Sequence, residues 1–103
     1  MAQSEIRIRV KFMSGLADLA GCRQLVVALP SHALLSDLVA DLGSKLGQPL
    51  AARLAGEPTD AYGYHVVAMV DSQIYPNPSV SQIGLTDGVT VVFMEPVAGG
   101  TGI

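Results

Sequence analysis

The chain has 103 residues, of which half are hydrophobic and only 15% are charged. This composition predicts one folded domain with an aliphatic core rather than a disordered chain. A net charge of −3 and six basic residues, scattered except for Arg7, Arg9 and Lys11 on one face of a strand, argue against nucleic-acid binding. The apolar runs are far shorter than the roughly 20 residues that span a bilayer. A single cysteine, Cys22, excludes an internal disulfide. We therefore expect one cytoplasmic domain, without a signal peptide, that binds neither nucleic acid nor membrane.

Residues 5–13 alternate almost perfectly between apolar and other side chains, which is typical of a half-buried strand. One face of this strand carries Ile6, Ile8, Val10 and Phe12. The opposite face carries Arg7, Arg9, Lys11 and Met13. A loop over residues 14–23 leads to a second strand at residues 24–29, closed by Pro30, and we expect the two strands to pair as a hairpin.

After Pro30 the apolar period changes to that of a helix. One stripe at spacings of three and four comprises Leu35, Leu38, Val39, Leu42 and Leu46. Asp37 near the start, and Lys45 and Gly47 at the end, suit the helix dipole and a C-cap, so a helix is predicted over residues 34–46. Residues 47–63 are interpreted as a connection rich in Gly and Pro, with room for one helical turn at residues 50–54.

Three extended segments follow, at residues 64–70, 73–75 and 89–94, separated by turns rich in Asp, Ser, Pro and Gly. Two strands, one helix and two or three more strands predict an α+β roll. Its mixed sheet of four or five strands has one main helix on one face and leaves the other face open. The residues expected inside include Val10, Phe12, Leu35, Leu38, Leu42, Val67 and Phe93.

The segment after the last strand is poor in side chains and reads Pro96-Val97-Ala98-Gly99-Gly100-Thr101-Gly102-Ile103. Consecutive glycines have no Cβ and therefore suit a tail that enters a narrow channel. We predict a folded domain over residues 1–95 and a flexible C-terminal Gly-Gly tail over residues 96–103.

This order of elements resembles the MoaD/ThiS family, the small β-grasp sulfur carriers related in fold to ubiquitin. The resemblance covers nearly the whole chain and begins with residues 8–12 and the loop Leu16-Ala17-Asp18-Leu19-Ala20-Gly21. It continues through Ser36-Asp37-Leu38 on the helix and Val70-Asp71-Ser72 after the third strand. Its most specific part is Leu85-Thr86-Asp87-Gly88, a strand of six residues and Pro96-Val97-Ala98-Gly99-Gly100.

The resemblance implies that a partner adenylyltransferase joins the carboxylate of Gly100 to AMP. Sulfur then displaces AMP and leaves a thiocarboxylate, which serves the synthesis of a molybdopterin-type cofactor or another sulfur-containing metabolite. The resemblance also implies that Val97, Ala98 and Gly99 thread the channel of the partner. Because residues 101–103 follow Gly100, the resemblance also implies trimming by a JAB-type metalloprotease. A sulfur donor and an acceptor synthase complete the expected partners.

Three apolar residues are predicted to form the surface that binds the partner. Strand parity places Met13 and Met94 on the open face of the sheet, and the resemblance places Met13, Ile74 and Met94 against the adenylyltransferase or a synthase subunit. The alternative is that these side chains pack at the edge of the core.

The remaining reactive residues predict no catalytic function. His32 and His65 lack neighbours at metal-ligand spacing, Cys22 has no paired histidine, and no triad or phosphate-binding loop is present in the sequence. We therefore expect a protein that is not an enzyme and that holds no metal or cofactor. Besides the sulfur carrier, two hypotheses stay open: a β-grasp interaction module whose tail is never activated, and a ubiquitin-like modifier conjugated to lysines.

Overall fold

The structure is a computed structural model that describes residues 4–13, 15–55 and 66–95. In these residues its strands are β1 (Glu5–Phe12), β2 (Gln24–Pro30), β3 (Val67–Val70), β4 (Gln73–Tyr75) and β5 (Thr90–Met94). The helices are α1 (Gly15–Ala20), α2 (Leu35–Leu46), α3 (Gln48–Leu54) and the 3₁₀ turn η1 (Pro78–Val80).

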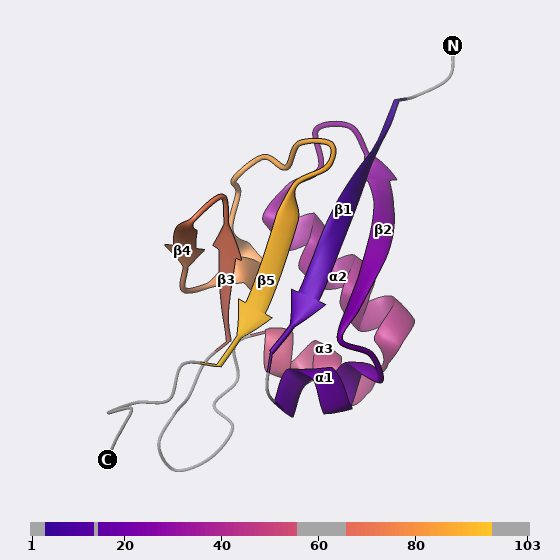
Figure 1. Ribbon diagram of the computed structural model, residues 1–103, viewed down its shortest axis with the longest axis vertical. Coiled ribbons are helices and arrows are strands. Elements are labelled where there is room, and N and C mark those ends of the chain that lie inside the picture. The colour runs from indigo at the N-terminus through magenta and orange to yellow at the C-terminus, as the bar shows by residue number, and fades with distance from the viewer. Residues whose placement is uncertain (1–3, 14, 56–65, 96–103) are drawn as a thin grey trace.

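The five strands form one mixed sheet in the order β2-β1-β5-β3-β4 (Figure 1). β1 pairs antiparallel with β2, as the predicted hairpin requires, and parallel with β5 in the centre of the sheet. β3 pairs antiparallel with both β5 and β4. The predicted α+β class and mixed sheet are therefore confirmed, and of the four or five strands expected the sheet has five.

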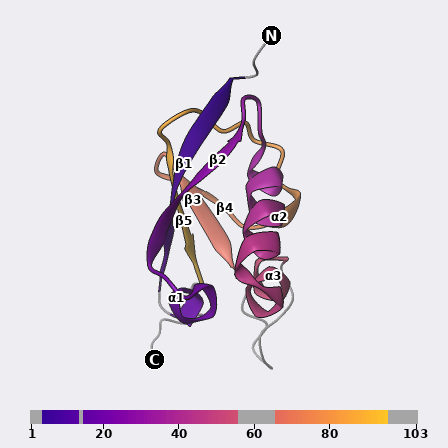
Figure 2. The same ribbon diagram turned by 90° about the vertical axis from the view of Figure 1, so that its right-hand side faces the viewer.

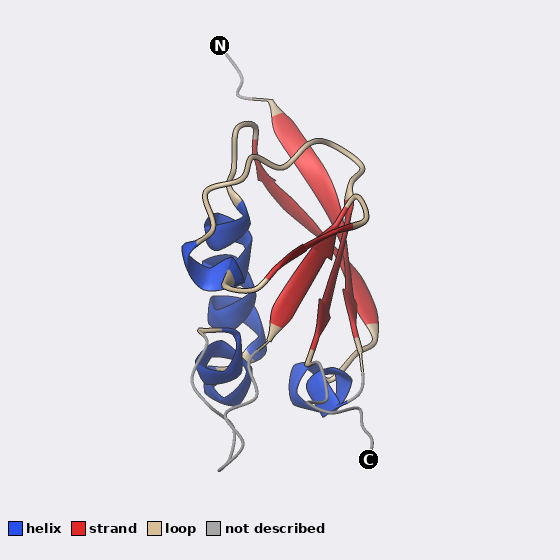
Figure 3. Ribbon diagram, turned by 90° about the vertical axis from the view of Figure 1, so that its left-hand side faces the viewer, coloured by secondary structure: helices blue, strands red, loops and turns tan. Residues whose placement is uncertain are grey.

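The helices lie mainly on one side of this sheet. Figures 2 and 3 show α2 and α3 in a layer beside the strands, with α1 at the end of the sheet where β1 stops. Within the described residues no helix covers the opposite face. α2 is the main helix that the apolar period predicted, and with α3 it lies in the connection from β2 to β3, the strands that flank the parallel β1–β5 pair.

The core fills the space between the helices and the covered face. β1 alternates strictly between exposed and buried residues, as predicted, and Ile8 and Val10 are completely buried. The ring of Phe12 stacks on that of Phe93 in β5, with centroids 6.0 Å apart. From α2 the side chains that enter the core are Leu35, Leu38, Val39 and Leu42. Each large apolar side chain that is fully buried contributes about 1.5–3 kcal/mol to stability.

α2 begins without a Ser or Thr cap, and main-chain and carboxylate groups replace one. The carboxylate of Asp37 accepts a hydrogen bond from the N–H of Leu34 at 2.8 Å. The N–H groups of Leu35 and Ser36 donate to carbonyls of the segment after η1, at 3.0 and 3.1 Å. Gly47, with φ of 108°, lets the chain turn directly from α2 into α3.

Three sequence expectations need correction. Residues 15–20 form helix α1 where a loop was predicted, because Leu16 and Ala20 lie one turn apart and both are buried. The expected single turn at residues 50–54 is the longer helix α3, which buries Leu50 and Leu54 completely. Val67 was predicted inside, but the buried residues of this segment are Val66, Ala68 and Val70.

Candidate functional site

The open face of the sheet is ordered in rows by the strand register. Lys11 of β1 is paired with Val92 of β5, Val92 with Met69 of β3, and Met69 with Ile74 of β4. In the next row Met94 is paired with Val67. Met13 lies beside the same end of β5, because its N–H donates to the carbonyl of Phe93 at 3.0 Å.

These rows bring together an apolar patch on one half of the open face. Its members are Met13, Val67, Met69, Ile74, Val92 and Met94. Met13 and Ile74 are 48% and 59% exposed, and the other four are half-buried. Exposed methionine suits an interface because its unbranched side chain adapts to the partner.

All three residues predicted to bind the partner belong to this patch; Met13 lies beside Met94, whereas Ile74 is separated from both. Met13 and Met94 lie at the ends of β1 and β5, whereas Ile74 lies on β4, with β3 between β4 and β5. Val67, Met69 and Val92 fill the space between them and were not predicted as members. Only the register of β3 against β5 and β4 shows that they join the three into one surface.

The other half of the open face is basic. Arg7, Arg9 and Lys11 project from β1 and are exposed, so half of the six basic residues of the chain lie on one strand. Arg9 is paired with Val26 of β2, which is 60% exposed. A partner that fits the whole face therefore combines an apolar surface with acidic groups along one side.

The predicted tail residues lie outside the described part of the chain: Val97, Ala98, Gly99 and Gly100. The last described residue is Glu95, which directly follows β5. Its carboxylate forms an ion pair with the guanidinium of Arg53 in α3. No sequence pattern pointed to this pair, whose members are 42 residues apart.

Other candidates for chemistry are few. Among residues 4–13, 15–55 and 66–95, no three His, Cys, Asp or Glu side chains gather where they could hold a metal ion. Cys22 is half-buried with a free thiol, and His32 is exposed. None of the described helices is long and apolar enough to cross a membrane.

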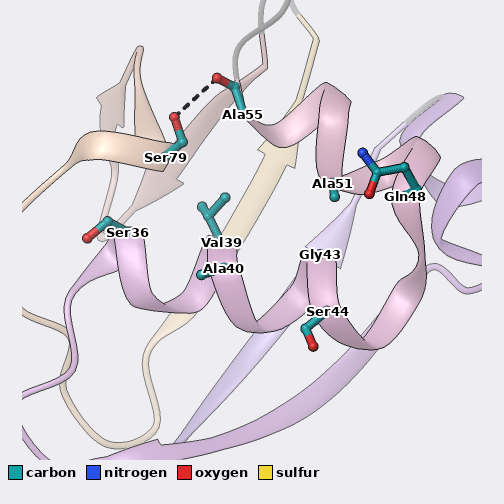
Figure 4. A pocket seen from close by; sticks show the side chains of 9 residues that line it. All are labelled: Ser36, Val39, Ala40, Gly43, Ser44, Gln48, Ala51, Ala55 and Ser79. Carbon is teal, nitrogen blue, oxygen red and sulfur yellow. Dashed lines mark hydrogen bonds between the residues drawn. The ribbon is translucent and has the colours of Figure 1, made fainter.

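A shallow groove of about 390 Å³ runs between α2 and α3 on the helical side (Figure 4). Its nine lining residues are Ser36, Val39, Ala40, Gly43, Ser44, Gln48, Ala51, Ala55 and Ser79. Small residues at the crossing bring the two helices close together, since a Cβ on Gly43 would lie 2.9 Å from that of Ala51. No charged side chain lines the groove, and its polar side chains are those of three serines and Gln48.

Neither a protein-family model nor a curated protein sequence matches this chain. Solved structures are similar. A Pyrococcus furiosus protein assigned as molybdopterin converting factor subunit 1 has a TM-score of 0.69 and 22% identity, covering 89% of this chain and 99% of that one. Small archaeal modifier protein 1 of Haloferax volcanii has a TM-score of 0.66 and 18% identity, over 89% and 99% of the two chains. Its namesake from Methanosarcina acetivorans has a TM-score of 0.64 and 18% identity, over 94% and 99%.

At these identities the likeness is one of fold. It confirms the predicted β-grasp fold, and it agrees with the resemblance to MoaD-like, ubiquitin-like proteins seen in the sequence. The other chains are covered almost completely, so the likeness extends over a whole small domain rather than a shared fragment.

Proposed function

We propose that this chain is a sulfur-carrier protein whose Gly100 is adenylated and then converted to a thiocarboxylate. The observation that carries the proposal is the position of the apolar patch at the exit of β5. Met94 belongs to the patch, and the segment Pro96-Val97-Ala98-Gly99-Gly100 begins two residues later. A partner docked on the patch is therefore beside the start of the tail. The similar structures include a molybdopterin converting factor subunit and small modifier proteins, which supports a carrier or modifier rather than an enzyme.

The chemistry asks little of the carrier itself. A carboxylate oxygen is a poor leaving group, so the partner joins the Gly100 carboxylate to the α-phosphate of ATP and pyrophosphate departs. A sulfur nucleophile then attacks the acyl carbon, and AMP leaves with the electron pair of the broken C–O bond. The carrier contributes one carboxylate on a stalk, and the catalytic groups belong to the adenylyltransferase. Use of ATP by that partner fits a cytoplasmic location.

The docking surface and the length of the tail are both compatible with a carrier whose carboxylate is activated by the catalytic groups of a partner. We assign Met13, Ile74 and Met94 to contact with the adenylyltransferase, and later with the acceptor synthase, and Arg7 and Arg9 to acidic groups at the rim. From Glu95, the five residues that lead to Gly100 span at most about 17 Å when fully extended. The partner's active site must therefore lie close to the docking surface.

Residues 101–103 must be removed before activation. Thr101 and Ile103 are β-branched and add bulk beyond the glycine pair, where a channel built for Gly99 and Gly100 has no room. We propose that a JAB-type metalloprotease cleaves after Gly100. A chain that still carries these residues is then an inactive precursor.

The test compares three versions of the chain with the adenylyltransferase of its host, ATP and a sulfide source. The version that ends at Gly100 should gain the mass of one oxygen-to-sulfur exchange. Residues 1–103, and a Gly100→Ala variant ending at residue 100, should remain unchanged while keeping the fold. If the version ending at Gly100 is never activated, the chain is instead an interaction module whose tail has no chemistry.

The similar modifier proteins favour one second function, conjugation of Gly100 to lysines of other proteins. No Lys or Arg follows Arg53, so trypsin would leave a remnant too long for routine detection. A protease that cleaves after aspartate would instead leave residues 88–100 on the modified lysine, because Asp87 is the last aspartate. Such branched peptides from host cells indicate a modifier, and a thiocarboxylate without them indicates a carrier.

A further inference from the structure

The ion pair between Arg53 and Glu95 joins the helical layer to the residue from which the tail begins. The two side chains are 31% and 17% exposed, so water screens this pair less than it screens a fully exposed one. The residue that pairs with Arg53 is the one that directly precedes Pro96. The pair is therefore placed to act on the start of the tail.

The direction of Glu95 follows from the strand before it. In β5 Val91 and Phe93 point into the core and Met94 points to the open face, so Glu95 returns to the helical side. Pro96 disfavours helical backbone at the preceding residue, which keeps Glu95 extended and preserves this alternation. Two adjacent residues thus point to opposite sides, Met94 toward the apolar patch and Glu95 toward α3.

α3 is a firm support for Arg53. Its side chains Leu50 and Leu54 are completely buried, and Ala51 packs closely against Gly43 of α2. The hydroxyl of Ser79 in η1 donates to the carbonyl of Ala55 at 3.3 Å, just beyond the end of the helix. Arg53 lies in the last turn, where a cation also suits the helix dipole.

We propose that the Arg53–Glu95 pair acts as a positioning device. It fixes Glu95, which we call the root of the tail, beside the apolar patch. The inference rests on the proposed function and adds to it two residues that touch neither AMP nor sulfur. Because only five residues lead from Glu95 to Gly100, an error in the position of the root is carried to the reacting carboxylate. Fixing the root restricts the directions in which the tail can leave the domain, so less conformational entropy is lost when the partner binds the tail.

The kinetic test uses the chain ending at Gly100 and measures adenylation against carrier concentration. Glu95→Gln should lower kcat about tenfold, because the carboxylate reaches the reactive geometry less often. KM should stay within about twofold, because the patch that binds the partner is intact. The charge reversal Arg53→Glu with Glu95→Arg should recover most of the lost rate. Loss confined to KM, or no loss, overturns the inference.

A matched control is the Lys45–Asp41 pair, an ion pair of 3.0 Å within α2 that does not involve the tail. Lys45→Gln should leave both kcat and KM unchanged. If it lowers kcat as much as Glu95→Gln does, the effect is general and the positioning role is wrong.

A second readout needs no partner enzyme. The ¹⁵N heteronuclear NOE of the Glu95 and Val97 amides should fall in Glu95→Gln and recover in the charge reversal, with Lys45→Gln as the control. If no version is ever adenylated, the proposed function fails and this measurement alone decides whether the pair fixes the root. If adenylation proceeds but kcat does not respond to Glu95→Gln, the inference fails whatever the NOE shows, and the proposed function stands.

Discussion

The two faces of the sheet carry different kinds of side chain, although both come from the same strands. On the face covered by α2 and α3, side chains such as Ile8, Val10, Val91 and Phe93 are completely buried. On the open face, β1 presents basic residues, while β3, β4 and β5, together with Met13 just after β1, present the apolar patch. The covered face therefore determines whether the chain folds, and the open face is free to determine what the folded domain binds.

The largest expected difference between the faces is in the effect on folding of a Glu substitution at two adjacent positions of β1, one on each face. Ile8→Glu should abolish folding, because burying an unpaired carboxylate costs several kcal/mol, comparable to the whole stability of a small domain. Arg9→Glu, one residue further along on the open face, should fold normally. Circular dichroism and amide proton dispersion measure both variants. A folded Ile8→Glu protein would show that the covered face is not the core.

A smaller change tests packing rather than charge. Leu42→Ala should cost about 2–5 kcal/mol, because the side chain is completely buried and leaves a cavity. Ile74→Ala, on the open face and 59% exposed, should change stability by no more than about 0.5 kcal/mol. Urea denaturation gives both values. Equal losses would remove the energetic distinction between the faces.

Close packing on the covered side should extend to the crossing of α2 and α3. Gly43→Ala should destabilise the domain by about 1 kcal/mol, because overpacking against Ala51 exceeds the gain in helix propensity. Adding Ala51→Gly makes room for the new methyl group, so the double variant should be more stable than the two single effects predict. Thermal unfolding of the four proteins completes the cycle. A more stable Gly43→Ala variant would indicate slack between the helices.

Acidic substitutions in the apolar patch of the open face should have the smallest effect on stability, and should weaken binding of the partner instead. Met13→Glu and Ile74→Glu should change stability by about 0.5 kcal/mol or less, yet weaken binding to the adenylyltransferase tenfold or more. Val80→Glu is the matched control, because Val80 is 71% exposed but lies on η1, which packs on α2. Calorimetric titration beside thermal unfolding separates the two effects. Equal weakening by Val80→Glu would show that the patch is not the docking surface.

Long periodic segments were predictable because many residues follow the same apolar repeat and therefore indicate the same buried face. The alternation of residues 5–12 and the apolar stripe of α2 define their buried faces without knowledge of any neighbour. Short or uniformly apolar segments contain no such agreement. α1 has only six residues, and Val66-Val67-Ala68-Met69-Val70 has no polar residue to set its phase. The pairing of Ala68 with Phe93 sets it instead.

The candidate site was likewise predictable only where a single strand determines which face a residue lies on. Met13 and Met94 were placed on the open face by parity within their own strands. Val67, Met69 and Val92 belong to the patch only through the register between strands. The pairing of Arg53 with Glu95 depends on how α3 packs, and α3 itself was predicted only as a single turn.

The parallel pair of β1 and β5 has a consequence for the order of events during synthesis. β5 lies between β1 and β3, so the centre of the sheet is incomplete until residues 90–94 have left the ribosome. Contacts between segments so far apart in sequence form late and slowly. The strand that closes the sheet is also the strand that leads into residues 96–100. An adenylyltransferase that docks on the completed sheet would therefore distinguish finished carriers from nascent or misfolded chains before any ATP is consumed.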